Sequence, residues 1–145
     1  MKSLFKQPSK PAKFKKSAPL KNDLVSRGRS QAEELVIGLL RINFPGINII
    51  RNDKSVLGRQ ELDIHLVDYK IAIEIDGLSH FKNIYGDKRL AESQERDARK
   101  NRRLEELEFT LYRIDISKMT KETLYQELKQ YMNTVLVPEL KKRIN

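Results

Sequence analysis

The stretch that decides the fold lies at residues 60–82 and reads QELDIHLVDYKIAIEIDGLSHFK. Apolar side chains occupy every second position on both sides of its centre, at 62, 64 and 66 and again at 71, 73 and 75. Because successive side chains of a strand point to opposite faces, this alternation predicts two strands that share one apolar face. A two-residue turn at Tyr69-Lys70 would join them into a β-hairpin.

That turn sets a register in which Asp63 lies opposite Asp76 and His65 lies opposite Glu74. The second face of the hairpin then gathers polar side chains: Glu61, Asp63, His65, Glu74 and Asp76. One explanation is a solvated face, which antiparallel sheets commonly have. The other is a bound divalent cation, because two aspartates that face each other without a cation in the same row repel. We favour the cation.

One helix and one strand are predicted before the hairpin. Ser30 followed by Glu33 forms a capping box, and apolar residues then recur on one face, so residues 30–43 are predicted to be a helix. Pro45-Gly46 ends that helix, and residues 47–52 are predicted to form a strand.

Two helices and one strand are predicted after the hairpin. A helix from about 87 to 107 precedes a strand at 109–114, and a last helix begins near Thr120 and is ended or bent by Pro138. The packing face of this last helix is predicted to contain Leu124, Leu128, Tyr131, Met132 and Val135. The order of elements predicts a mixed α/β (α+β) fold.

The helix at 87–107 has two distinctive faces. Asp97 lies in an inward stripe with Leu90 and Leu104, so it either pairs with a buried partner or points into a site. A neighbouring face is basic and carries Arg96, Arg99, Lys100 and Arg103. This face could follow a phosphate backbone, or it could be an ordinary solvated surface on which nearby glutamates pair with the arginines.

Composition limits the chemistry. The chain has 145 residues, of which 39% are hydrophobic, and this is enough for the core of one domain. It has no cysteine, which excludes disulfides, thiol catalysis and cysteine-bound zinc, and only two histidines. A metal site would therefore depend on carboxylates and would favour a hard cation.

Most of the net charge of +9 lies in residues 1–29, which are rich in lysine and proline and poor in aliphatic side chains. Such a segment is predicted to be a flexible basic arm that contacts a polyanion, most commonly nucleic acid. A solubilising tail and a contact with anionic membranes are the alternatives. Neither a signal peptide nor an apolar run of membrane-spanning length is visible, so we expect a soluble cytoplasmic protein without a membrane partner.

The acidic hairpin matches a known pattern. Asp63, then after ten residues Glu74-x-Asp76-Gly77, and then His80 resemble the PD-(D/E)XK nuclease superfamily, specifically its very-short-patch-repair-like endonuclease branch.

Further segments are similar to that branch in the same order along the chain. SQAE resembles its opening helix, and RDARKNRRLEELEFTLYRI resembles its D-x-x-R-x-x-x-L helix with the strand that follows, where Arg113 occupies an arginine position of the branch. The resemblance covers roughly residues 30–116.

The resemblance implies a restriction-endonuclease-like core, in which a four-stranded mixed sheet is flanked by helices, at residues 30–145 after the basic arm at 1–29. It also implies a metal-dependent DNA endonuclease. Mg²⁺ or Mn²⁺ would be bound by Asp63, with Asp76 or Glu74 as the second ligand.

Other site residues follow from the same motif positions. His80 would supply or accept a proton, with an ordinary loop histidine as the alternative. Glu33 and Asp97 would be secondary carboxylates that position water or His80, and Glu33 has an alternative role as the cap partner of Ser30. His65 has no matching motif position and is left out of the catalytic set.

The chain departs from the family pattern at two positions. The usual lysine is absent because Asp76 fills its place, and Lys82 or Lys100 could replace it. Glu108 stands where the branch commonly has a glycine before the last strand, which affects a helix C-cap. The cations expected to contact the DNA backbone are Lys13, Lys15, Lys16, Arg27, Arg29, Lys82, Arg99, Lys100 and Arg103.

Two alternatives remain open at this point. A degenerate nuclease-like fold could bind nucleic acid or a protein without cutting, and an enzyme could act on RNA or on a DNA junction. The sequence does not distinguish a monomer from a homodimer.

Overall fold

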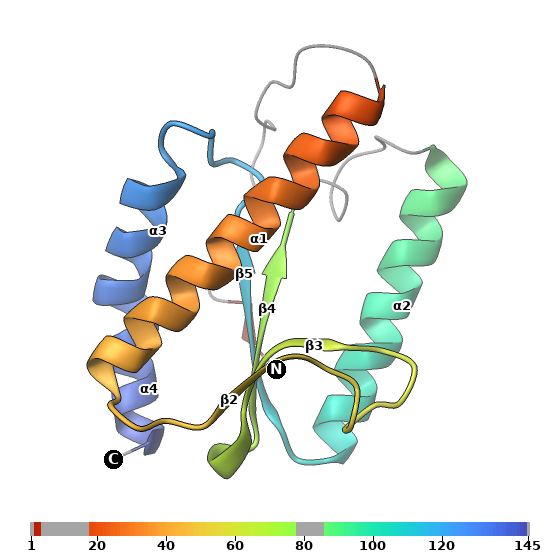
Figure 1. Cartoon of the computed structure of the whole chain (residues 1–145). Helices are drawn as coiled ribbons and strands as arrows, with labels where there is room; N and C mark the ends of the chain where they lie inside the picture. Colours follow the sequence, from red (N-terminus) through yellow and green to blue (C-terminus); the bar gives the residue numbers. More distant parts are fainter. Residues whose placement is uncertain (1, 4–17, 78–85, 145) are drawn as a thin grey trace.

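The computed structural model describes residues 2–3, 18–77 and 86–144, and it has a mixed β-sheet with helices on both faces (Figure 1). The strand order is β1-β5-β4-β3-β2. The strands are β1 (Lys2–Ser3), β2 (Ile49–Asp53), β3 (Leu62–Leu66), β4 (Ile71–Asp76) and β5 (Thr110–Asp115). β2, β3 and β4 are antiparallel neighbours, whereas β5 runs parallel to β4 and to β1. The predicted fold class is confirmed, and the short β1 extends the four predicted strands.

The helices form two layers around the sheet. α1 (Ala18–Asn43), α3 (Leu124–Tyr131) and α4 (Val137–Ile144) cover one face, and α2 (Asp87–Glu106) covers the other (Figure 1). None of the helices in the described part of the chain is long and apolar enough to cross a membrane.

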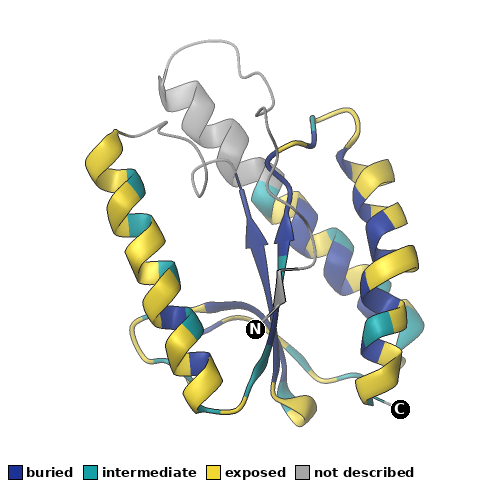
Figure 2. Cartoon of the chain, turned by 180° about the vertical axis from the view of Figure 1, so that it is seen from behind, coloured by how far each residue is buried: buried dark blue, intermediate teal, exposed yellow. Residues whose placement is uncertain are grey.

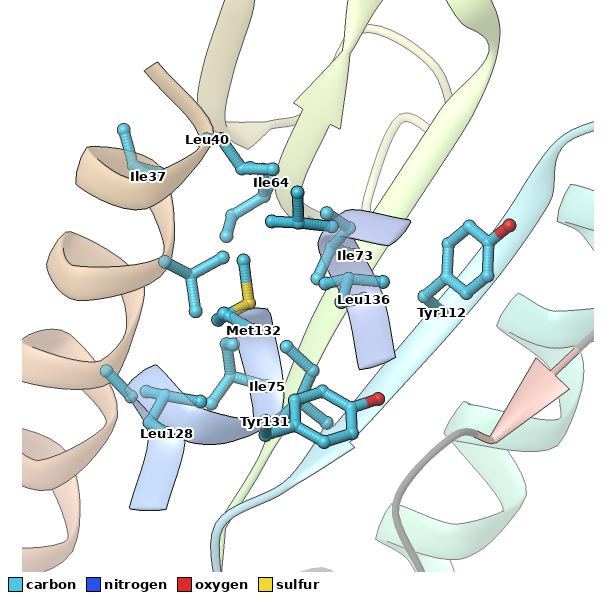
Figure 3. Close-up of a cluster of buried hydrophobic side chains, with 14 of the residues drawn as sticks. Ile37, Leu40, Ile64, Ile73, Ile75, Tyr112, Leu128, Tyr131, Met132 and Leu136 are labelled. Carbon is cyan, nitrogen blue, oxygen red and sulfur yellow. The ribbon is translucent and has the colours of Figure 1, made fainter. Parts of the chain in front are cut away.

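The main core lies between the sheet and the layer of α1, α3 and α4 (Figure 3). Ile64, Ile73 and Ile75 of the hairpin pack there, as the alternation predicts. A smaller apolar cluster holds the C-terminal half of α2 against the opposite face, and its buried members are Leu62, Ala72, Leu104 and Leu111. Leu62 was expected on the other face. Most of α2 is exposed (Figure 2), so its attachment depends on few apolar contacts.

Helix α1 begins at Ala18, not at the predicted Ser30. Pro19 lies in the first turn of α1. Backbone N–H groups in the first turn of a helix have no intrahelical acceptor, so proline, which lacks an N–H, is tolerated there. Ser30 is consequently an interior residue and not an N-cap. The predicted boundary between arm and domain falls inside α1, and residues 4–17 of the arm lie outside the described part of the chain.

The hairpin forms, but its predicted register is wrong by two residues. Ile64 pairs with Ile73, because the connection is longer than the two-residue turn that was expected. Val67–Tyr69 forms a 3-10 turn, and Lys70 adopts a left-handed conformation with φ of 51°.

The corrected register changes which polar residues face each other. His65 lies opposite Ala72 and not opposite Glu74. Asp63, one residue beyond the pair that Ile64 forms, is level with Glu74 and not with Asp76.

The C-terminal helix continues through Pro138, which was expected to end or bend it. A π-helical turn at Met132–Leu136 precedes it and adds a residue to one turn. This insertion rotates the following side chains around the axis. Val135, predicted to pack, is therefore exposed, and Leu136 is buried instead.

Glu108 ends α2 in a left-handed conformation with φ of 63°. Its N–H donates to the carbonyl of Glu105, and the N–H of Phe109 donates to the carbonyl of Leu104. These two bonds form a Schellman motif, in which glycine is the usual residue. The departure at Glu108 thus falls on the C-cap, as predicted.

Candidate functional site

Asp63 of β3 and Glu74 of β4 lie just beyond the backbone pair of Ile64 and Ile73. The N–H of Asp63 donates to Oε2 of Glu74 at 2.8 Å, and the N–H of Ile75 donates to Oδ2 of Asp63 at 2.9 Å. Each carboxylate therefore accepts an N–H from the neighbouring strand in place of a main-chain carbonyl. We call Asp63 and Glu74 the carboxylate pair, and its orientation is set by the sheet backbone.

Lys100 of α2 reaches the carboxylate pair from the opposite layer. Its Nζ donates to Oε1 of Glu74 at 2.5 Å, and both side chains are buried. Burial, and secondarily the negative charge of Asp63, raise the pKa of Glu74 to about 7, although Lys100 opposes this shift. Glu74 therefore gains and loses its proton near neutral pH.

Glu33 of α1 lies beside Asp63, and two arginines contact its carboxylate. Nη2 of Arg51, on β2, donates to Oε1 of Glu33 at 3.1 Å. Nη2 of Arg29, on α1, lies 3.4 Å from Oδ1 of Asp63 and 4.0 Å from Oε2 of Glu33. Burial raises the pKa of Glu33, and the hydrogen bond from Arg51 opposes that shift. The side chain of Glu33 thus belongs to the site and not to a helix cap.

Arg113 of β5 binds the remaining predicted carboxylates. Its Nη1 donates to Oδ1 of Asp76 at 2.8 Å, and its Nη2 donates to Oδ1 of Asn101 at 2.7 Å. Its Nη2 also lies 3.8 Å from Oδ1 of Asp97. Of the two alternatives for Asp97, a charged partner or an open site, the structure shows the partner, which is Arg113. Arg113 thereby joins β4, β5 and α2.

His65 is part of a separate buried pair. Its Nδ1–H donates to Oδ2 of Asp53 at 2.7 Å, and its ring lies 5.3 Å from that of Phe109. This hydrogen bond, and those from Ser55, lower the pKa of Asp53 to about 2. His65 therefore joins β2 to β3 through Asp53, which is consistent with leaving it out of the catalytic set.

Glu61 is exposed, but the other four residues of the predicted polar face are not solvated, so a solvated face does not explain them. Asp63, His65, Glu74 and Asp76 are each 4–7% exposed. The premise that the acids lack a nearby cation is also wrong, because Lys100 and the arginines supply positive charge. Electrostatic balance alone therefore does not require a metal ion.

A metal ion at this site would have few protein ligands. Within the described ranges, no three His, Asp or Glu side chains are gathered as ligands of one ion. Mg²⁺, however, typically takes one or two protein carboxylates and keeps several waters. The carboxylate pair meets that smaller requirement, since it offers two hard oxygen donors that the backbone orients. The third predicted ligand, Asp76, binds Arg113 and makes no hydrogen bond to the carboxylate pair among the contacts of the described residues.

Several predicted site residues lie outside the described part of the chain: His80, Lys82, Lys13, Lys15 and Lys16. Arg27 lies in α1. Of the predicted cations of α2, Arg99 and Arg103 are exposed, and Arg99 pairs with Glu95 at 2.9 Å. Lys100 was placed on the same outer face, which is wrong, because it points inward to Glu74.

Sequence reasoning missed Arg51 and Asp53. Arg51 lies in the middle of β2 and Asp53 at its end, in a segment whose apolar residues alone gave the predicted strand. Two charged residues in a short edge strand were the available signal, but their partners Glu33 and His65 are distant in the sequence.

No protein-family model, curated protein or solved structure matches this chain.

Proposed function

We propose that the chain is a DNA endonuclease that uses Mg²⁺ or Mn²⁺ to hydrolyse phosphodiester bonds, with Asp63 and Glu74 as the metal ligands. The supporting observation is the carboxylate pair: two buried acids oriented by N–H groups of adjoining strands, with Lys100 bound to one of them. Burying such charges costs free energy. Two buried acids in one short hairpin are therefore more typical of a functional site than of a hairpin that serves only the fold.

Each residue of the site has a specific part in this proposal. When bound, the metal ion would polarise the phosphate and lower the pKa of a water molecule. Lys100 takes the role of the missing motif lysine, since it holds Glu74 and carries a positive charge beside it. Arg113 keeps Asp76 and Asp97 in place as a positioning residue. His80 remains the predicted proton donor or acceptor.

Basic side chains around the site would contact the DNA backbone. Arg99 and Arg103 are exposed on α2, and Arg29 lies at the carboxylate pair. Together with the basic N-terminal segment they would give affinity that falls steeply as salt increases.

The test combines metal binding with DNA cleavage. Calorimetric titration with Mn²⁺ and nicking of supercoiled plasmid in Mg²⁺ are measured for wild type, Asp63→Asn and Asp68→Asn. Asp68 is a matched control because it is exposed in the turn of the same hairpin. We expect Asp63→Asn to lose Mn²⁺ binding and about 100-fold or more of the nicking rate, because a bound ion contributes several kcal/mol to the transition state.

A second candidate is a binding module that holds nucleic acid without cutting it. The observation in its favour is that Lys100, Arg29 and Arg51 already neutralise the nearby acids without a metal ion. Wild-type protein that binds DNA but takes up no Mn²⁺ and leaves plasmid intact would establish this alternative and reject the endonuclease.

A further inference from the structure

Two arginines from different elements approach the buried acids from the solvent side. The side chain of Arg29 on α1 is 39% exposed and that of Arg51 on β2 is 38% exposed, whereas those of Glu33 and Asp63 are only 7% and 9% exposed. The stem of Arg29 lies 3.7 Å from where a Cβ on Gly77 would be, at the end of β4. Both guanidinium groups are therefore held at the boundary between the site and water.

Each arginine has hydrogen-bonding capacity left. Among the residues that the structure describes, the ion pairs of Arg29 and Arg51 use only Nη2. A guanidinium has five N–H donors in a planar fork that matches two oxygens of a phosphate. The remaining donors, at a half-exposed position beside a buried acid, suit an anion that arrives from solvent.

The charges of the site are balanced in the absence of metal when Glu74 is ionised. Glu33 and the carboxylate pair supply three acidic groups, and Arg29, Arg51 and Lys100 supply three cationic groups. A divalent cation at the carboxylate pair would leave two positive charges in excess. A phosphodiester group carries the opposite charge and would remove part of that excess.

We propose that Arg51, together with Arg29, binds a nucleic-acid phosphate beside the carboxylate pair, and that this phosphate and the metal ion increase each other's affinity. Without metal, Glu33 and Asp63 hold the two arginines. Metal binding at Asp63 weakens the hold on Arg29. Arg29 and the donors of Arg51 that its bond to Glu33 does not use then bind the phosphate. Because such coupling is reciprocal, the phosphate must raise metal affinity by the same factor. This inference rests on the proposed function, since it requires a metal at the carboxylate pair.

The experiment measures binding and not activity. Mn²⁺ is titrated calorimetrically into wild type, Arg51→Ala, Arg51→Lys and Arg59→Ala, each with and without a saturating thymidine dinucleotide, which contributes a single phosphodiester. Arg59 is the matched control, because it is exposed in the connection between β2 and β3. Far-UV circular dichroism verifies that each variant is folded.

We expect the dinucleotide to increase the Mn²⁺ affinity of wild type and of Arg59→Ala by about tenfold, within the usual range of coupling between two ligands. Arg51→Ala should reduce this factor to about twofold or less while Mn²⁺ affinity without dinucleotide stays equal or rises, since a competing cation has been removed. Arg51→Lys should give an intermediate factor, because lysine keeps the positive charge and loses the planar fork of donors. It also provides the test if Arg51→Ala fails to fold.

The outcomes separate this inference from the proposed function. Mn²⁺ binding that the dinucleotide does not change, or coupling that survives in Arg51→Ala, overturns the inference and leaves the metal site intact. Absence of Mn²⁺ binding in wild type, with and without the dinucleotide, overturns both.

Discussion

The burial of Glu74, which its contact with Lys100 offsets only in part, makes the stability of the protein depend on pH in a specific direction. The pKa of Glu74 is raised from 4.5 to about 7, mainly by burial. Between these two values the unfolded chain loses the proton of this group while the folded protein keeps it. The stabilising contribution is therefore fully present below about pH 4.5, and it is lost as pH rises through about 7.

The magnitude follows from the size of the shift. One pKa unit corresponds to about 1.4 kcal/mol, so a shift from 4.5 to about 7 corresponds to about 3 kcal/mol of unfolding free energy. The perturbation is the double variant Glu74→Gln/Lys100→Met, which replaces the ion pair by neutral side chains of similar size. Replacement of both partners is tolerated far better than removal of one, which leaves a buried charge unpaired.

The measurement is urea unfolding followed by far-UV circular dichroism at pH 4.5, 6, 7 and 8, because the chain contains no tryptophan. We expect the unfolding free energy of wild type, relative to that of the double variant, to fall by about 3 kcal/mol across this range. The single variant Glu74→Gln serves as the control for an unpaired lysine and should be less stable than the double variant at every pH. If the unfolding free energies of wild type and double variant change in parallel with pH, the reasoning is refuted, since Glu74 would then have the same pKa in the folded and the unfolded state.

Three other features of the structure give separate predictions. His65 holds the pKa of Asp53 at about 2, so Asp53→Asn should lower the unfolding free energy at neutral pH, and this difference should shrink in acid unfolding as pH falls from about 4 to about 2. Glu108→Gly should raise the unfolding free energy by about 1 kcal/mol in urea, since glycine accepts a positive φ without strain; a loss of stability would contradict this. Arg113→Lys should cost about 2 kcal/mol in the same assay, because lysine cannot bind several acceptors in a planar fork, whereas Arg99→Lys at an exposed pair should cost less than about 0.5 kcal/mol.

The features that the sequence predicted well are those encoded by local periodicity. The alternation at 62–66 and 71–75 gave the correct hairpin, and the order of elements gave the correct fold class. The register failed because it depends on the turn, and the left-handed conformation of Lys70 has no strong local signature. The error mattered for function, because it placed Asp76 instead of Glu74 opposite Asp63.

The ion pairs of the site were not predictable in the same way. Arg51 and Glu33 are 18 residues apart, and Lys100 and Glu74 are 26 residues apart, so only the packing of α1 and α2 on the sheet brings them together. Helix faces were also assigned by apolarity, which placed Lys100 outside.

A geometric signal for Lys100 was nevertheless present in the sequence. Lys100 lies four residues before Leu104 and three after Asp97, and residues at these spacings share one face of a helix. Since Leu104 must pack on the sheet, a lysine one turn earlier faces the sheet as well, where the hairpin supplies an acid. A cation at such a position indicates a buried acidic partner and not a solvent-exposed surface. Applied to this chain, the rule predicts that an acid of the hairpin pairs with Lys100. The structure shows that this acid is Glu74, which favours Glu74 over Asp76 as the second ligand beside Asp63.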